Sequence, residues 1–235
     1  MKRIHRLAAA ALAATLVAGA TAAYADVLIL RSVGPSSNRY KAGQRLPDNG
    51  RIVLKAGDSV SVLRPGGTRV FRGPGTYGLD TAAMQTSATA RGARSGTGVV
   101  RGTDGALLDG SWPADLWQVN ASAAGNACFV AGSPVTLWRP DTDKRAAVVV
   151  TTRAGATTRL SWPARQATLQ VPARAAAEGT RISYAIPGTP RQTQISLAEL
   201  KVDPRNRDAV GQALLERRCR HQIDHFIALN EEGAS

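Results

Sequence analysis

The spacing most suggestive of metal chemistry lies near the C-terminus, where the run HQIDH occupies residues 221–225. In a helix, two histidines four residues apart lie on one face, as in the zinc motif H-E-x-x-H, whose glutamate is the general base. Gln222 stands at the position of that glutamate and cannot accept a proton. A third ligand could come from Asp224 or Glu216, which leaves a zinc enzyme as an alternative. We predict instead two exposed histidines and no metal site.

Serines are plentiful in the chain, but no hydrolase signature accompanies them. The GxSxG pattern is absent, and a nucleophile needs a base within hydrogen-bonding reach. Several carboxylates fall in predicted turns, where such side chains usually bond the turn backbone: Asp48, Asp58, Asp104, Asp141 and Asp143. Phosphate loops and dinucleotide fingerprints are also missing. The sequence therefore predicts no catalytic residue, no cofactor and no enzymatic activity.

The N-terminus predicts export. MKRIHR is basic, residues 7–21 form an apolar run, and Ala23-Tyr24-Ala25 supplies the small residues that signal peptidase requires. An uncleaved anchor is the alternative, but it needs roughly 20 apolar residues. We expect cleavage after Ala25, a mature chain beginning at Asp26 with no transmembrane segment, and a periplasmic location.

The chain contains two cysteines, Cys128 and Cys219. An even cysteine count in an oxidising compartment favours pairing over two buried free thiols. A loop of this length would be stabilised by roughly 4 to 5 kcal/mol in the chain-entropy account. No C-x-x-C motif is present, so neither cysteine is expected to bind metal or act in redox chemistry. We predict a structural disulfide.

The chain is strongly basic, with a formal charge of +13 that falls to +10 when Lys2, Arg3 and Arg6 leave with the signal peptide. Such a charge suits an anionic envelope polymer as partner. The arginines are scattered singly, however, and the compositional bias of a GC-rich genome would produce the same pattern without any anionic partner. Aromatic residues are not interleaved with them, so nucleic acid is not an expected partner.

Residues 26–80 read as a small β-domain. Short apolar runs at 27–30, 51–55, 59–63 and 68–72 are separated by Gly-containing turns. The run SVSVL alternates with period two, which places Val60 and Val62 on one face and Ser59 and Ser61 on the other. Residues 59–72 therefore predict a β-hairpin that turns at RPGG.

Residues 53–79, VLKAGDSVSVLRPGGTRVFRGPGTYGL, carry a family resemblance. The order of apolar strand, Gly-Asp, alternating strand, Gly turn, strand and Gly-Pro-Gly resembles the small periplasmic β-domain of the FecR family of signalling regulators. The resemblance covers residues 50–80 and implies the fold and, by analogy, a role in envelope sensing or assembly. That family places a cytoplasmic segment and one transmembrane helix ahead of this domain, whereas this chain has a cleavable signal.

Residues 81–111 are rich in Gly, Ala, Ser and Thr and predict a flexible linker. Beyond it, short strands with regular turns predict an antiparallel β-sandwich-like domain over residues 112–200: 116–120, 127–130, 135–138, 146–152, 157–162, 167–171, 181–186 and 194–197. Trp117, Trp138 and Trp162 are expected in its core, and a sugar-binding platform is the alternative. The fold class is mainly β.

A C-terminal helix packed on the sandwich is expected over residues 203–229, because Asp203-Pro204 is a helix-start signal. Apolar residues then recur at three- and four-residue steps: Gly211, Leu214, Leu215, Cys219, Ile223, Phe226 and Ile227. Cys219 lies on this stripe and should face the sheet that carries Cys128. His221 would lie about 200° around the helix from Cys219, on the solvent side.

These features predict an exported, non-enzymatic binding protein, whose partner is another envelope protein or an anionic envelope polymer. A cell-wall glycan-binding or glycan-processing protein is the alternative, supported by the basic charge and the tryptophans. Exposed strand edges bind partner strands. The candidate interaction edge is the hairpin, through Ser59, Ser61, Arg64, Arg69 and Arg72.

Overall fold

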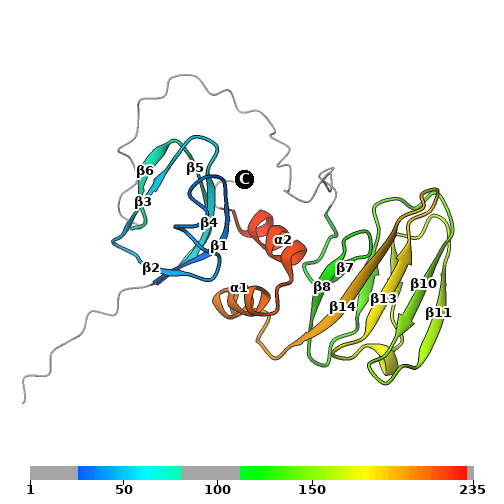
Figure 1. The fold of residues 1–235 in the computed structure, drawn as a ribbon. Helices are drawn as coiled ribbons and strands as arrows, with labels where there is room; N and C mark the ends of the chain where they lie inside the picture. Colours follow the sequence, from blue (N-terminus) through cyan, green and yellow to red (C-terminus); the bar gives the residue numbers. More distant parts are fainter. Residues whose placement is uncertain (1–25, 81–111, 232–235) are drawn as a thin grey trace, which may run out of the picture.

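The computed structural model describes residues 26–80 and 112–231 (Figure 1). The protein is mainly β, as predicted, with fourteen strands and two helices in the described residues. The expected signal peptide and linker lie outside these residues. No helix in the described part is long and apolar enough to cross a membrane.

The N-terminal part contains a four-stranded sheet in the order β2-β1-β4-β5, in which every neighbouring pair is antiparallel. Its strands are β1 (Asp26–Val33), β2 (Arg45–Pro47), β4 (Ser59–Arg64) and β5 (Gly67–Arg72). A separate two-stranded sheet pairs β3 (Arg51–Leu54) with β6 (Gly75–Gly78). The predicted hairpin is confirmed, since Arg64 pairs with Gly67 across Pro65-Gly66.

Strand β4 is covered on both faces. Val60 and Val62 are buried in one core together with Ile29 and Phe71, as the alternation predicted. The opposite face was expected to be polar and open, yet Ser61 is also buried. Leu63 lies on that opposite face, in a second core formed with the C-terminal helices.

The C-terminal part is sandwich-like, and its sheets are mixed rather than purely antiparallel. One sheet has the order β11-β10-β13-β14-β8 and comprises β8 (Gly125–Val130), β10 (Ala146–Thr151), β11 (Thr157–Trp162), β13 (Arg181–Ala185) and β14 (Gln192–Leu200). The other has the order β12-β9-β7 and comprises β7 (Gln118–Asn120), β9 (Thr136–Trp138) and β12 (Thr168–Gln170). The pairs β14–β8 and β7–β9 are parallel. A 3-10 turn (Ala173–Ala175) follows β12. Every predicted strand overlaps an observed one.

The C-terminal segment forms two helices, α1 (Arg207–Glu216) and α2 (Arg220–Asn230), where one was predicted. The break falls at Arg218, whose φ of 58° is left-handed. The Cys219 amide still donates to the Leu214 carbonyl at 2.9 Å, so the first helix closes before the chain turns. The first helix begins at the N-cap Asn206, whose side chain accepts from the Ala209 amide, three residues after the predicted Asp203.

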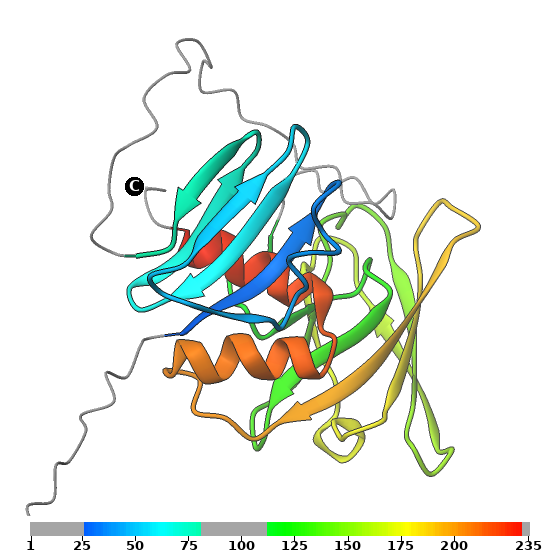
Figure 2. The same ribbon diagram turned by 60° about the vertical axis from the view of Figure 1, so that its left-hand side comes forward.

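Both helices lie between the two β parts (Figures 1 and 2). One buried cluster contains residues from the N-terminal sheet, the C-terminal sheet and the helix pair: Leu28, Leu30, Leu63, Cys128, Ala198, Leu200, Val210, Leu214, Cys219, Ile223, Phe226 and Ile227. The helix pair therefore joins the two β parts through a shared core. Because a packed core resists deformation, the N-terminal sheet, the helix pair and the C-terminal sheet keep fixed positions relative to one another.

Candidate functional site: the arginine groove

The two histidines of the HQIDH run do not both face solvent. His225 is only 3% exposed, and its ring stacks on Trp112 with centroids 5.2 Å apart. Its burial lowers its pKa, although the nearby carboxylate of Asp115 opposes this shift. The expectation that both histidines are exposed is therefore wrong for His225. Helix α2 lies between the two β parts, so it is buried over a wider arc than one apolar stripe predicts, and this arc includes His225.

The described residues contain no cluster of three or more His, Cys, Asp or Glu side chains that could hold a metal ion. Asp224, one of the two considered as a third ligand, instead contacts the Arg31 guanidinium at 2.5 Å. Burial raises the pKa of the Asp224 carboxyl, while the charge of Arg31 opposes the shift. This ion pair connects α2 to β1.

Gln222, at the position of the missing general base, has a structural role. Its side-chain oxygen accepts from the Cys128 amide at 2.6 Å, and its nitrogen donates to the Cys128 carbonyl at 2.8 Å. The same nitrogen donates to the Leu116 carbonyl at 3.1 Å. Strand β8 is at the edge of its sheet, so the Gln222 amide replaces a neighbouring strand there and satisfies buried backbone groups.

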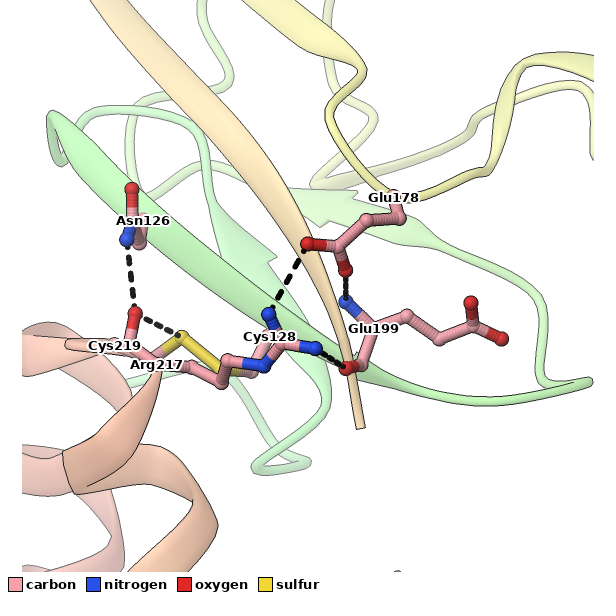
Figure 3. Close-up of polar contacts among 6 residues, drawn as sticks. All are labelled: Asn126, Cys128, Glu178, Glu199, Arg217 and Cys219. Carbon is pink, nitrogen blue, oxygen red and sulfur yellow. Dashed lines mark hydrogen bonds and ion pairs between the residues drawn. A yellow bond between two sulfur atoms is a disulfide. The ribbon is translucent and has the colours of Figure 1, made fainter. Parts of the chain in front are cut away.

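The turn between α1 and α2, residues 217–219, is fixed to the C-terminal sheet; we call it the helix junction (Figure 3). Cys219 forms the predicted disulfide with Cys128, and both residues are fully buried. The Arg217 guanidinium donates to Glu178 and to the Glu199 carbonyl, each at 3.2 Å. The Asn126 side chain donates to the Arg217 carbonyl at 2.8 Å. Disulfide and hydrogen bonds together hold the helices against β8 and β14.

The predicted interaction edge is only partly at an edge. Ser59 and Ser61 belong to β4, which is paired with β1 on one side and β5 on the other, so they cannot accept a partner strand. The edge strand is β5, and at Thr68 it already forms a bridge with Glu231.

Arg69 packs with its guanidinium carbon 5.3 Å from the centre of the Phe71 ring, so it covers the core of its own sheet. Arg72 is exposed, and its carbonyl accepts from the Tyr77 hydroxyl. Arg64, at the hairpin tip, lines two neighbouring hollows of the surface. Of the predicted edge, the tip therefore provides the best candidate for binding.

A groove of about 460 Å³ separates the hairpin tip from the start of α1. Its lining consists of Arg64, Pro65, Gly66, Gly67, Arg205, Asn206, Arg207 and Asp208. A neighbouring hollow of about 240 Å³ shares Arg64, Pro65 and Asp208 and adds Asp26, Leu28, Arg45 and Leu63. We call the two together the arginine groove. Glycine is required at the tip, because φ is 104° at Gly66 and 150° at Gly67.

The electrostatics of the groove are basic, with four arginines and two aspartates in its lining. Arg45, Arg205 and Arg207 were not singled out from the sequence. The segment RNR at 205–207 places one arginine on each side of the N-cap Asn206. This local pattern could have indicated a basic patch at the start of α1. Their proximity to Arg64 depends on tertiary packing across more than 140 residues of chain and had no local signal.

Two of the predicted turn carboxylates, Asp58 and Asp141, bond the backbone as expected. The Asp58 carboxylate accepts from the amides of Ser36 and Lys55. Its burial would raise its pKa, but these hydrogen bonds outweigh burial, and the pKa lies below its usual value. Asp141 accepts from the Asp143 amide at 3.0 Å. Asp104 lies outside the described residues.

The tryptophans contribute to packing. Trp162 is fully buried in the C-terminal core, with Arg139 4.9 Å from its ring centre. Trp117 and Trp138 are partly buried, and Trp117 packs against the shared core. The predicted core role is confirmed for Trp162, and none of the three lines the arginine groove.

No protein-family model matches this chain, and no curated protein matches it significantly. The resemblance of residues 50–80 to the FecR β-domain therefore stays a prediction.

Proposed function

We propose that this chain is an exported, non-enzymatic binding protein of the cell envelope, and that the arginine groove is its binding surface. The groove is the observation that carries this proposal. It is a concave surface lined by arginines from three separate segments of chain. Arginine side chains bind and orient anionic groups through charge and several hydrogen bonds.

The scaffold supports this role. The shared core and the Arg31–Asp224 ion pair fix the N-terminal sheet, which carries the hairpin, relative to the helix pair. The disulfide fixes the helix pair to β8. A binding surface whose two walls are already positioned loses less conformational entropy when a partner binds. By analogy with the FecR-like resemblance, envelope sensing or assembly is the process in which we expect such binding.

Crosslinking in the native envelope, followed by affinity capture of the mature chain, tests this function. The informative variant is Arg205→Gln/Arg207→Gln, because both residues are exposed and line the groove. The charge-matched control is Arg159→Gln/Arg181→Gln, which removes two exposed arginines from β11 and β13.

We expect a defined envelope component to be recovered with the wild type and the control and to be at least fivefold depleted with the groove variant. The unfolding curve of the groove variant should match that of the wild type, which would show that the loss is not due to misfolding. Equal recovery with all three proteins would reject the groove as the binding surface.

A further inference from the structure

We infer that the arginine groove binds phosphate groups carried by a polymer in solution. This inference rests on the proposed function, because it names the chemistry of the partner bound at the same surface. The lining contains Arg45, Arg64, Arg205 and Arg207 but only two carboxylates, Asp26 and Asp208. Concave basic surfaces concentrate the field and attract anions.

The arginines at the start of α1 are available for a ligand. Arg205 and Arg207 are exposed, and within residues 26–80 and 112–231 their guanidinium groups form no hydrogen bond or ion pair. Arg31 and Arg217, by contrast, serve the fold, since Arg31 pairs with Asp224 and Arg217 pairs with Glu178. Two unengaged guanidinium groups beside one groove are consistent with a role outside the fold.

Phosphate is the ligand group that best suits this lining. The planar guanidinium fork donates two parallel hydrogen bonds to phosphate oxygens, and it keeps its charge at every physiological pH. The cations come from two sides of the groove, the hairpin tip and the start of α1, so adjacent phosphates of one chain could contact both walls. Arg45 is partly committed, since it donates to Gln212 at 2.7 Å.

The surface does not favour a lipid bilayer as the source of the phosphate. Surface binding to a bilayer usually combines basic residues with apolar side chains that enter the headgroup region. The large exposed apolar residues of the described chain are Val53 and Leu229, and neither lines the groove. We therefore assign the groove to a phosphate-bearing polymer.

The test uses inorganic pyrophosphate as the probe, titrated into the mature chain at low salt and followed by the amide resonances of Gly66 and Gly67. Binding should weaken as salt is added, because exposed charges are screened. Arg205→Gln/Arg207→Gln should lower the affinity by about tenfold, if each exposed pair contributes a few-fold. Arg159→Gln/Arg181→Gln should stay within twofold of the wild type.

Asp208→Asn should change the affinity for pyrophosphate in the opposite direction. It removes a carboxylate shared by both hollows, so affinity for pyrophosphate should rise by about two- to fivefold. Pyrophosphate that shifts amides over the whole basic surface, with equal affinity for all variants, would overturn the inference. The inference would also be overturned if the chain bound phosphatidylglycerol vesicles more tightly than phosphatidylcholine vesicles but did not bind pyrophosphate.

Failure of this inference can be separated from failure of the proposed function. If the envelope component is lost with Arg205→Gln/Arg207→Gln but pyrophosphate does not bind, the groove is a binding surface for another chemistry and the phosphate assignment is wrong. If pyrophosphate binds in the groove but envelope capture is unchanged by the substitutions, the phosphate inference stands and the proposed function fails.

Discussion

The helix pair has two regions of opposite character, the helix junction and the arginine groove. At the junction, the disulfide is buried, and Gln222 satisfies the backbone groups of Cys128. At the groove, Arg205 and Arg207 point from the start of α1 into an exposed hollow. The first region fixes the helices to the C-terminal sheet, whereas the second leaves cations exposed.

This difference separates stability from binding. Buried polar groups destabilise a fold strongly when their partner is removed, whereas exposed charges contribute little. Substitutions at the junction should therefore lower the free energy of unfolding, and substitutions at the groove should change binding alone.

Removing the disulfide should have the largest effect. Cys128→Ala/Cys219→Ala should lower the free energy of unfolding by about 2 to 4 kcal/mol, because the crosslink closes a long loop and fixes the junction to β8. Urea unfolding followed by circular dichroism measures the change. Wild-type protein in reductant should show a similar loss. A change below about 1 kcal/mol would mean that the packing of the helices suffices without the crosslink.

Gln222→Leu should follow, at about 2 to 3 kcal/mol, because it leaves the Cys128 amide and two carbonyls without their hydrogen-bond partner in a buried place. The matched control is Gln212→Leu, on the exposed face of α1, which should cost less than about 1 kcal/mol. Urea unfolding of both variants at the same pH measures the two losses in free energy of unfolding. Equal losses would show that the Gln222 amide does not close the edge of β8.

The strands could be predicted because their signals are local. Alternation in SVSVL and the Gly-containing turns depend on neighbouring residues, and the observed hairpin agrees with them. The disulfide followed from cysteine count and expected compartment. Tertiary packing was not accessible in this way: Ser61 lies on the face of β4 that packs against the C-terminal helices, which are far away in sequence.

The helix break and the groove were missed for different physical reasons. Arg218 adopts a left-handed φ without being glycine or asparagine, so no residue type marked the end of α1. His225 is buried because α2 lies between the two β parts, which together cover more than one side of the helix. The groove combines Arg64 with residues of α1, and only the shared core brings them together.

The smallest expected effect is a pH dependence of the free energy of unfolding. It tests the buried region of the helix pair without removing the disulfide. Burial lowers the pKa of His225 in the folded protein below its value of 6.5 in the unfolded chain. The unfolded state therefore binds the proton more readily, so the free energy of unfolding is highest above pH 6.5 and falls as the pH drops through this range. Through His225 alone, we therefore expect the free energy of unfolding to be lower at pH 5 than at pH 7.

His225→Gln should flatten this pH dependence, and the difference between wild type and variant isolates His225 from the carboxylates. The groove should not respond in the same way, because guanidinium groups keep their charge over this range. Urea unfolding and pyrophosphate titration, each at pH 7 and pH 5, measure the two responses. If the stability of the wild type did not change while groove binding did, the buried and exposed regions would not be separate, and the division drawn from the helix pair would be wrong.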